Sequence, residues 1–327
     1  MTSPSLRKAF VLGAGLGKRL QPLTAKRPKP LIPIFQKPLI TFAFDHLLSC
    51  GISDIIVNTH HCSEMYGKMF PHTEAGFEYR NARVTLRHEP TLLETGGGIK
   101  NIEDLIGSEP FLVYNGDVLA DIPLSSFIEH HFSSGNIATL LLRSSGGPLQ
   151  VQWDRASGSI LDLGGKIGAF PASPGFLFTG IYILDPRIFS WLEAGHITSI
   201  TPVFVEMIRR KEKVGGFLCD EGMWRDLGTR DAYLEVHREL ERRNFQLSYP
   251  VSSPWPVHVA ESAHIEEGAS LSGMVVAGEN SHIGAGACLH DTILWEDIEI
   301  ASGSSLDRCI ITSGQSVQGC FSEKDFG

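Results

Sequence analysis

The chain has 327 residues and a mass of 35.8 kDa, more than one hydrophobic core usually organises, which predicts two domains. It has 42% hydrophobic and 20% charged residues and no apolar run of about 18 residues, so the composition argues for a globular protein without membrane association. The six cysteines form no CxxC pair and the N-terminal segment lacks a leader pattern, so we expect a reduced, cytoplasmic protein.

The net charge of −9 is distributed unevenly along the chain. Residues 1–44 contain eight bases and no acid, whereas the rest of the chain contains 20 bases and 37 acids. Positive charge gathered in one segment of an acidic protein predicts a site for a small anion. The acidic remainder argues against nucleic-acid binding, which requires broad neutralisation of phosphates.

Short apolar runs alternate with amphipathic stretches over residues 9–243. Taken in chain order, the pattern predicts strands at 9–12, 55–58, 84–87, 111–114, 137–142, 176–184 and 217–219. Helices are predicted at 40–50, 124–132, 202–211 and 231–243. This alternation indicates a Rossmann-like α/β domain whose mostly parallel sheet is covered on both faces.

The segment 249–256 contains three prolines and interrupts the pattern, so we place a boundary between a domain at 1–248 and one at 249–327. Aliphatic residues then recur every six positions, as in Val259, Ile265 and Leu271. Equivalent residues of successive coils are 17 or 18 positions apart. Such a repeat resembles a left-handed parallel β-helix, here of about three coils. A small β-sandwich is the alternative. Unpaired backbone at the coil ends predicts a homo-oligomer.

A glycine-rich loop follows the first predicted strand. Its backbone N–H groups can form a nest for phosphates, to which we assign Leu12, Gly13, Ala14, Gly15, Gly17 and Lys18. The spacing fits neither a P-loop nor the dinucleotide fingerprint. Arg19 and Lys29 follow on a path stiffened by four prolines. Cations on such a platform suit a triphosphate that releases pyrophosphate.

The segments Gly13-x-Gly15-x-Gly17-x-Arg19-Leu20-x-Pro22-Leu23-Thr24 and Pro28-Lys29-Pro30-Leu31-x-Pro33 resemble the signature of sugar-1-phosphate nucleotidyltransferases. The resemblance extends over residues 7 to about 243. It implies that Arg19 and Lys29 contact phosphates and that Arg19 stabilises the transition state. It also implies that Asp117, at the end of a strand, and Asp226 hold Mg²⁺. More than a hundred residues separate these two aspartates, so only the fold can bring them together.

Three further segments carry substrate residues by the same resemblance. One segment corresponds to the part of the family beside the nucleobase; it contains Glu94, Thr95, Gly96 and Gly97. Its sequence motif resembles that of the branch that makes UDP-N-acetylmuramic acid. Guanylyltransferases for mannose or heptose 1-phosphate carry a related motif. Asn115 and Gly180 correspond to sugar contacts. Many relatives have a Glu-Lys-Pro segment that holds the sugar phosphate. This chain lacks it, and Lys166 is the cation left to supply that contact.

The resemblance implies transfer of a nucleotidyl group from UTP or GTP to a sugar 1-phosphate, giving a nucleotide sugar for cell-envelope polysaccharides. The attacking phosphate oxygen is already ionised, so positioning and charge stabilisation would suffice. Three alternatives stay open: a silent regulatory subunit, a second acyltransferase activity in the β-helix, and a nicotinamide oxidoreductase. The joint presence of Arg19, Lys29, Asp117 and Asp226 argues against the first of them.

Overall fold

The structure is a computed structural model that describes residues 6–73, 76–168 and 175–327. Residues 1–5, the start of the segment considered for a leader, lie outside it. The described chain forms two compact units. The first comprises 6–15, Phe42–Asp226 and Leu247–Pro250; the second comprises Leu16–Thr41, Leu227–Gln246 and Val251–Gly327. Residues 16–41 and 227–246 thus pack with the C-terminal segment, although they precede the predicted boundary at 248.

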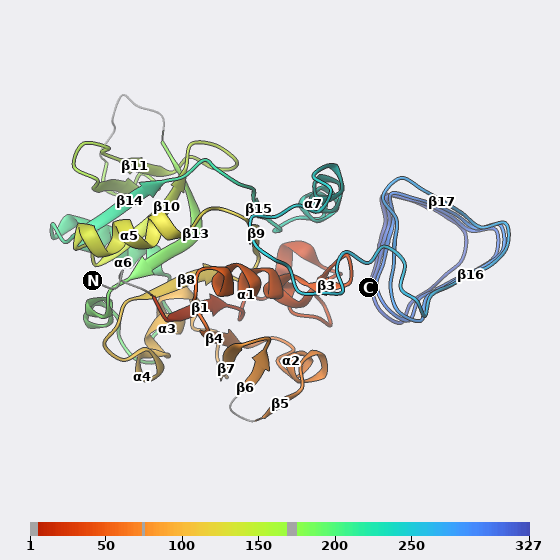
Figure 1. Ribbon diagram of the computed structural model, residues 1–327, viewed down its shortest axis with the longest axis horizontal. Coiled ribbons are helices and arrows are strands. Elements are labelled where there is room, and N and C mark those ends of the chain that lie inside the picture. Colours follow the sequence, from red (N-terminus) through yellow and green to blue (C-terminus); the bar gives the residue numbers. More distant parts are fainter. Residues whose placement is uncertain (1–5, 74–75, 169–174) are drawn as a thin grey trace. The chain divides into compact units, whose positions relative to one another are not determined.

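The first unit is built on a nine-stranded sheet with a parallel centre, which confirms the predicted Rossmann-like α/β class (Figure 1). The strand order is β14 (Val214–Leu218), β10 (Ala138–Arg143), β13 (Leu177–Leu184), β8 (Phe111–Asn115), β1 (Lys8–Leu12), β4 (Asp54–Thr59), β7 (Ala82–His88), β6 (Gly76–Tyr79) and β5 (His72–Thr73). β8, β1, β4 and β7 pair in parallel, whereas β13 runs antiparallel to both of its neighbours.

Helices cover both faces of this sheet. Phe111 to Tyr114 are all buried, and successive side chains of a strand point to opposite faces, so neither face is open at β8. The helices that begin in or lie within this part of the chain are α1 (Leu39–Ser49), α2 (Glu64–Met69), α3 (Glu94–Lys100), α4 (Glu103–Ile106), α5 (Ser125–Ser134) and α6 (Ile200–Arg209). α3 and α6 pack against each other, and their apolar residues share one core with Phe10 and Val113.

Three short pieces complete the first unit. β9 (Val118–Ala120) pairs antiparallel with β15 (Trp224–Asp226), and β11 (Val151–Trp153) pairs antiparallel with β12 (Ile160–Leu163). A 3-10 helix, η3 (Pro186–Trp191), follows β13. The sequence pattern did not predict these two small sheets, because strands of three or four residues carry too little alternation to recognise.

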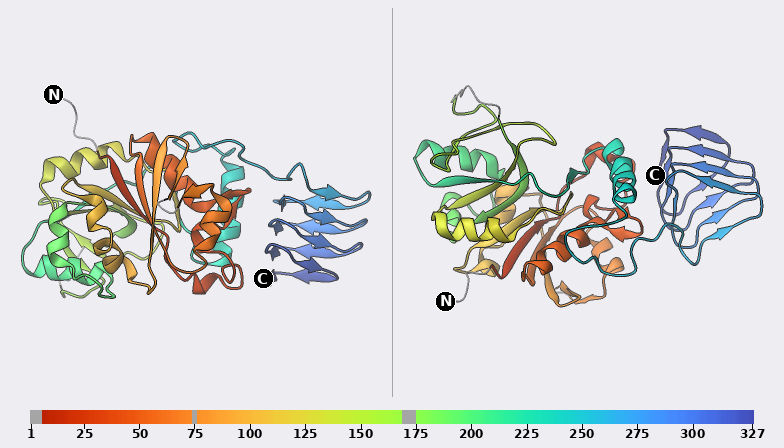
Figure 2. Two further views of the ribbon diagram at one scale, coloured as in Figure 1. Left: turned by 90° about the horizontal axis from the view of Figure 1, so that it is seen from below. Right: turned by 45° about the horizontal axis from the view of Figure 1, so that its top comes forward.

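The C-terminal segment of the second unit is the predicted left-handed β-helix. Three parallel sheets run along it, and its coils outline a triangle in Figure 1 and stack in Figure 2. Each sheet has four strands, so one coil follows the three that the repeat predicted. The sheets are β16 (His264–Ile265), β19 (His282–Ile283), β22 (Glu299–Ile300), β25 (Ser316–Val317); β17 (Ser270–Ser272), β20 (Cys288–His290), β23 (Ser305–Asp307), β26 (Cys320–Ser322); and β18 (Val276–Ala277), β21 (Ile293–Leu294), β24 (Ile310–Ile311), β27 (Asp325–Phe326).

The aliphatic repeat forms the core of the β-helix. Leu271, Leu289, Leu306 and Phe321 occupy matching positions in successive coils. Phe321 follows Leu306 after only 15 residues, and this shorter step hid the last coil from the periodicity. The inward aliphatic side chains are almost fully buried from the second coil onward, for example Ile283 and Leu289 at 0% and 1% exposure.

The second unit also holds the segment with the glycine and proline signature. This segment contains η1 (Lys18–Leu20), η2 (Lys29–Leu31), β2 (Pro33–Ile34) and β3 (Lys37–Pro38), and it is joined by the helix α7 (Arg230–Arg242). The Thr229 hydroxyl caps α7 by accepting the Ala232 N–H at 3.3 Å. The Phe35 ring contacts His237 of α7 and His258 of the C-terminal segment, each at 4.8 Å between ring centroids. None of the helices within the described ranges is long and apolar enough to cross a membrane.

Candidate active site

The turn Asn115-Gly116-Asp117 lies directly against the end of β1. The Gly116 N–H donates to the Leu12 carbonyl at 3.0 Å, and a Cβ at Gly116 would lie 2.5 Å from that oxygen. Only glycine therefore permits this approach. Because the carboxyl ends of parallel strands collect ligands, the turn places Asp117 at the edge where an α/β sheet binds its substrate.

Asp226 lies beside this turn. In the antiparallel pairing of β9 with β15, Asp226 is directly opposite Val118, the residue that follows Asp117. The strand is held in place by Trp224, whose Nε1–H donates to the Thr179 carbonyl at 2.8 Å. Asp117 is half-buried and Asp226 exposed, so both carboxylates are within reach of solvent and substrate. The strand register thus places the backbone of Asp226 next to the turn that carries Asp117, so the two predicted metal ligands lie in neighbouring segments.

Gly13 is fixed by a buried polar chain that the sequence analysis missed. Its N–H donates to the Asn58 Oδ1 at 2.8 Å, and the Asn58 Nδ2 donates to the Glu89 Oε1 at 2.8 Å. The other Glu89 oxygen accepts the Leu93 N–H at 3.0 Å. Glu89 is fully buried, so its charge depends on these donors. Asn58 lies near the carboxyl end of β4 and Glu89 directly follows β7, and this position at strand ends is the signal that could have identified them.

Glu94, Thr95, Gly96 and Gly97 form the start of α3 rather than a loop ahead of it. A Cβ at Gly96 would lie 2.9 Å from the Thr198 carbonyl oxygen, and one at Gly97 would lie 2.4 Å from the His196 carbonyl oxygen. The Thr95 hydroxyl accepts the Ile200 N–H at 2.8 Å. The glycines therefore make room for the protein's own backbone. Glu94 is exposed and has a positive φ of 59°.

Gly180 of β13 lies beside Asn115 of β8, the neighbouring strand in the sheet. Its φ is 78°, and a Cβ there would come within 2.4 Å of the Asn115 Nδ2. The structure therefore groups Asn115 and Gly180 with the Asp117 turn. Lys166 is exposed in the loop after β12, and its carbonyl accepts a hydrogen bond from Arg209 at the C-terminal end of α6. That contact lies at the opposite end of α6 from Ile200, which contacts Thr95.

In the second unit, the predicted phosphate-binding residues lie on two 3-10 turns. Gly17 has a φ of 60°, and its carbonyl accepts the Thr24 hydroxyl at 2.8 Å. Lys18 and Arg19 are exposed on η1. The Arg19 guanidinium packs on Gly228, where a Cβ would lie 2.7 Å from its Nη2. Lys29 is the first residue of η2 and is only 6% exposed, so its side chain is largely buried, unlike those of Lys18 and Arg19.

A second group of potential metal ligands lies on the outside of the β-helix, on His264, Glu266 and His282. His282 contacts the Glu299 carboxylate through Nδ1 at 2.7 Å and the Glu266 carboxylate through Nε2 at 3.0 Å. The Glu299 contact, followed by the Glu266 contact, raises the pKa of His282 above its ordinary value. A protonated His282 would donate from both ring nitrogens, so these contacts are those of an ion-paired ladder on the surface.

Comparisons with known proteins identify the family of this chain. The family model described as "Nucleotidyl transferase" matches residues 8–243. N-acetylmuramate alpha-1-phosphate uridylyltransferase of Neisseria meningitidis is 31% identical over 68% of this chain and 93% of its own length. Mannose-1-phosphate guanylyltransferase of Mycobacterium tuberculosis is 27% identical over 92% of this chain and 83% of its own. The fold matches UDP-glucose pyrophosphorylase from Acinetobacter baumannii, with a TM-score of 0.61, 20% identity, and coverage of 74% of this chain and 96% of the other.

Proposed function

We propose that this chain, which belongs to the nucleotidyl transferase family and is a sugar-1-phosphate nucleotidyltransferase, has a specific pair of substrates. It transfers the uridylyl group from UTP to N-acetylmuramate 1-phosphate. An enzyme of this class joins a sugar 1-phosphate to a nucleoside monophosphate and releases pyrophosphate. The observation that carries the proposal is the pairing of Asp226 opposite Val118, beside Asp117. The assignment of UTP as the nucleotide rests on the sequence motif at residues 94–98 and on the 31% identity to the Neisseria enzyme.

Enzymes of this kind generally use a divalent metal ion, and we assign Mg²⁺ to Asp117 and Asp226. Two carboxylates fit this ion because it prefers oxygen ligands and accepts the remainder of its shell from water and phosphates. The ion would neutralise charge on the α-phosphate and the sugar phosphate. Asn115 and Gly180, grouped with Asp117, would orient the sugar phosphate, and Lys166 would add a cation if its loop approaches the sugar.

Arg19 and Lys29 would bind the triphosphate and stabilise the departing pyrophosphate. Lys29 is nearly buried, so its ammonium has little freedom to lose on binding. Arg19 packs on Gly228, which follows Asp226 by two residues. Lys18 is a further phosphate contact.

The remaining assignments concern the nucleoside. The backbone of Leu12, Gly13, Ala14, Gly15 and Gly17 would face its phosphates and base, and Glu94, Thr95, Gly96 and Gly97 would border the base. The buried Asn58 and Glu89 support this role because they link Gly13 to the start of α3. The glycines of α3 would contact the nucleoside through backbone atoms.

A second candidate is transfer of guanylyl from GTP to mannose 1-phosphate or heptose 1-phosphate. It is favoured by the Mycobacterium mannose enzyme, which matches 92% of this chain, and by a 29% identical D-glycero-alpha-D-manno-heptose 1-phosphate guanylyltransferase of Aneurinibacillus thermoaerophilus, of which 98% is covered. Base selection cannot come from the shared signature, because both candidates need the same phosphate contacts.

The test is pyrophosphate release across a grid of UTP and GTP with N-acetylmuramate, mannose, heptose, glucose and N-acetylglucosamine 1-phosphates, with and without Mg²⁺. We expect release that requires Mg²⁺, UTP and N-acetylmuramate 1-phosphate. Release only with GTP and a mannose or heptose phosphate would replace the first candidate with the second. We also propose a cytoplasmic homo-oligomer assembled through the β-helix, with a catalytic domain at 1–248; sedimentation velocity would give its mass.

A further inference from the structure

Resting on the proposed function, we propose that Trp295 and Glu296 of the β-helix are positioning residues for nucleotide binding. They act on the phosphate segment, defined here as residues 16–33, which carries Arg19 and Lys29. The β-helix then takes part in each turnover in addition to any assembly of copies. The contacts that carry this assignment all lie within the second unit.

The first contact is a buried arginine. Arg27 is 5% exposed, and a charged side chain is almost never buried without a partner. Its Nη2 pairs with the Glu296 carboxylate and donates to the Ser313 hydroxyl at 3.1 Å. Its guanidinium also lies over the Trp295 ring, 4.7 Å from the centroid. All three partners belong to the β-helix, so its coils hold the middle of the phosphate segment.

Arg27 is two residues from Lys29, and the path between them is stiff. Pro28 and Pro30 flank Lys29 and fix their own φ angles. The Leu31 N–H donates to the Pro28 carbonyl at 2.9 Å and closes the turn. A shift of Arg27 is therefore passed on to Lys29, because Pro28, the one residue between them, cannot rotate about φ and the turn after it is closed by a hydrogen bond.

A second connection reaches the end of the same segment. The Trp295 Nε1–H donates to the Tyr233 hydroxyl at 3.1 Å, and that hydroxyl donates to the Pro33 carbonyl at 2.5 Å. Trp295 is 2% exposed and Tyr233 is fully buried, so solvent cannot replace these bonds. Trp295 thus contacts Arg27 directly and Pro33 through one hydroxyl, and the stretch that contains Lys29 is held on both sides.

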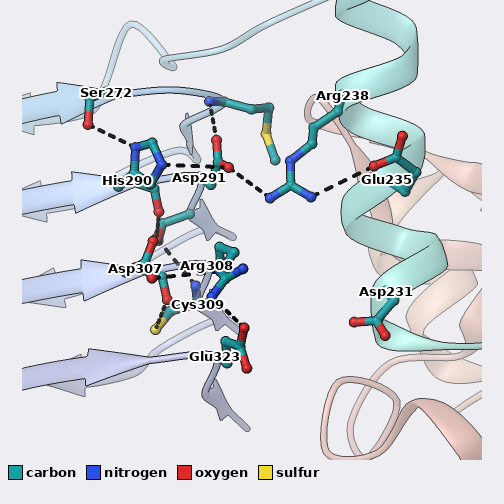
Figure 3. Close-up of polar contacts among 12 residues, drawn as sticks. Asp231, Glu235, Arg238, Ser272, His290, Asp291, Asp307, Arg308, Cys309 and Glu323 are labelled. Carbon is teal, nitrogen blue, oxygen red and sulfur yellow. Dashed lines mark hydrogen bonds and ion pairs between the residues drawn. The ribbon is translucent and has the colours of Figure 1, made fainter.

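The β-helix also makes ion pairs that do not involve the phosphate segment, and these provide a matched control. Figure 3 shows Arg238 of α7 between Glu235 of its own helix and Asp291 of the β-helix. The Arg238 Nη2 donates to Asp291 at 2.8 Å, and the other Asp291 oxygen accepts the Met274 N–H. If ion pairs to the β-helix only stabilised the fold, variants of Glu296 and of Asp291 would have the same kinetic constants.

The experiment compares Glu296→Gln with Asp291→Asn. We measure pyrophosphate release while varying NTP and sugar 1-phosphate separately, NTP binding without sugar, and unfolding by urea. We expect Glu296→Gln to lower kcat/KM for NTP about tenfold and to weaken NTP binding, while the KM for sugar phosphate changes less than about twofold. Asp291→Asn should lose stability while its kinetics stay within about twofold of the wild type. Glu296→Asp, which keeps the charge, should recover part of the loss.

The positioning role is overturned if Glu296→Gln, folded at the assay temperature, matches Asp291→Asn in every kinetic constant. If Glu296→Gln does not fold, Trp295→Phe decides the matter, because it keeps a ring over Arg27 and removes only the bond to Tyr233; a normal KM for NTP would then overturn the proposal. Wild-type turnover reports on the proposed function, whereas the binding difference between wild type and variant reports on this inference even without turnover.

Discussion

At the scale of single residues, the groups to which we assign the chemistry are held by short contacts rather than by burial alone. Asp117 follows a glycine that touches β1, and Asp226 is fixed by the pairing of β15 with β9. Both carboxylates remain accessible. A carboxylate that holds a cation contributes little to folding, so its loss should affect turnover far more than stability.

The first prediction concerns these carboxylates. Asp117→Asn and Asp226→Asn should each lower turnover on the order of a thousandfold, because an amide cannot supply the negative charge that the metal ion needs. Their midpoints of thermal unfolding should stay near the wild type. Asp154→Asn, in an exposed turn closed by Ser157, is the control and should keep full activity. Near-normal turnover of either site variant would refute the assignment.

The second prediction concerns Glu89, which sequence reasoning missed. Glu89→Leu removes the acceptors of the Asn58 Nδ2 and of the Leu93 N–H, which should lower the free energy of unfolding by about 1–3 kcal/mol. Because Asn58 also orients Gly13, NTP binding should weaken as well. Urea unfolding and equilibrium NTP titration measure the two effects. A stable variant with unchanged NTP affinity would show that the chain of bonds is not needed.

At the scale of elements, a neutral histidine holds α7 to Phe35, two residues after the phosphate segment. His237 donates from Nδ1 to the Tyr233 carbonyl at 2.8 Å and accepts the Phe35 N–H at Nε2, 3.4 Å away. These two bonds require the neutral Nδ1–H tautomer. Burial lowers the pKa of His237 to about 4, outweighing the bond to Tyr233. His46 and His131 are likewise lowered to about 4 by burial.

The third prediction follows from the sign of this shift. A histidine whose folded pKa is depressed stabilises the folded state above its unfolded pKa of 6.5, and that stability is lost as the pH falls from 6.5 toward 4. The free energy of unfolding should therefore decrease between pH 7.5 and 5.5, by about 1 kcal/mol for each such group. His237→Leu should be less stable at pH 7.5 but should show a smaller decrease. An equal decrease in both proteins would rule out this role for His237.

At the scale of the whole molecule, the β-helix and the phosphate segment belong to one compact unit. The fourth prediction is that deletion of residues 251–327 will not leave an independent enzyme. Without its partners, the buried charge of Arg27 becomes exposed and the Phe35 ring loses the contacts to His258 and the rest of that segment. Amides of residues 16–41 should lose protection from hydrogen exchange, and NTP affinity should fall. Unchanged protection in 16–41 would contradict the prediction.

Features that depend on local geometry could be predicted from the sequence. Apolar periodicity predicted seven strands of the nine-stranded sheet and the helices α1, α5, α6 and α7 to within a few residues, because side chains repeat every two residues in a strand and every 3.6 in a helix. The six-residue repeat predicted the β-helix, since each short wall needs one inward aliphatic residue. The family signature, a run of closely spaced residues, identified Arg19 and Lys29 by resemblance.

Contacts between residues far apart in the sequence could not be predicted and are shown by the tertiary structure alone. Asp117 and Asp226 are brought together by strand register, and a register between strands a hundred residues apart leaves no local pattern. The same holds for Asn58 with Glu89 and for Arg27 with Glu296, whose pairing depends on packing between elements. The glycines of α3 are a further case. In the fold, the Cα atoms of Gly96 and Gly97 face the backbone of residues 196–199, so only their backbone atoms are left for the proposed contact with a nucleoside.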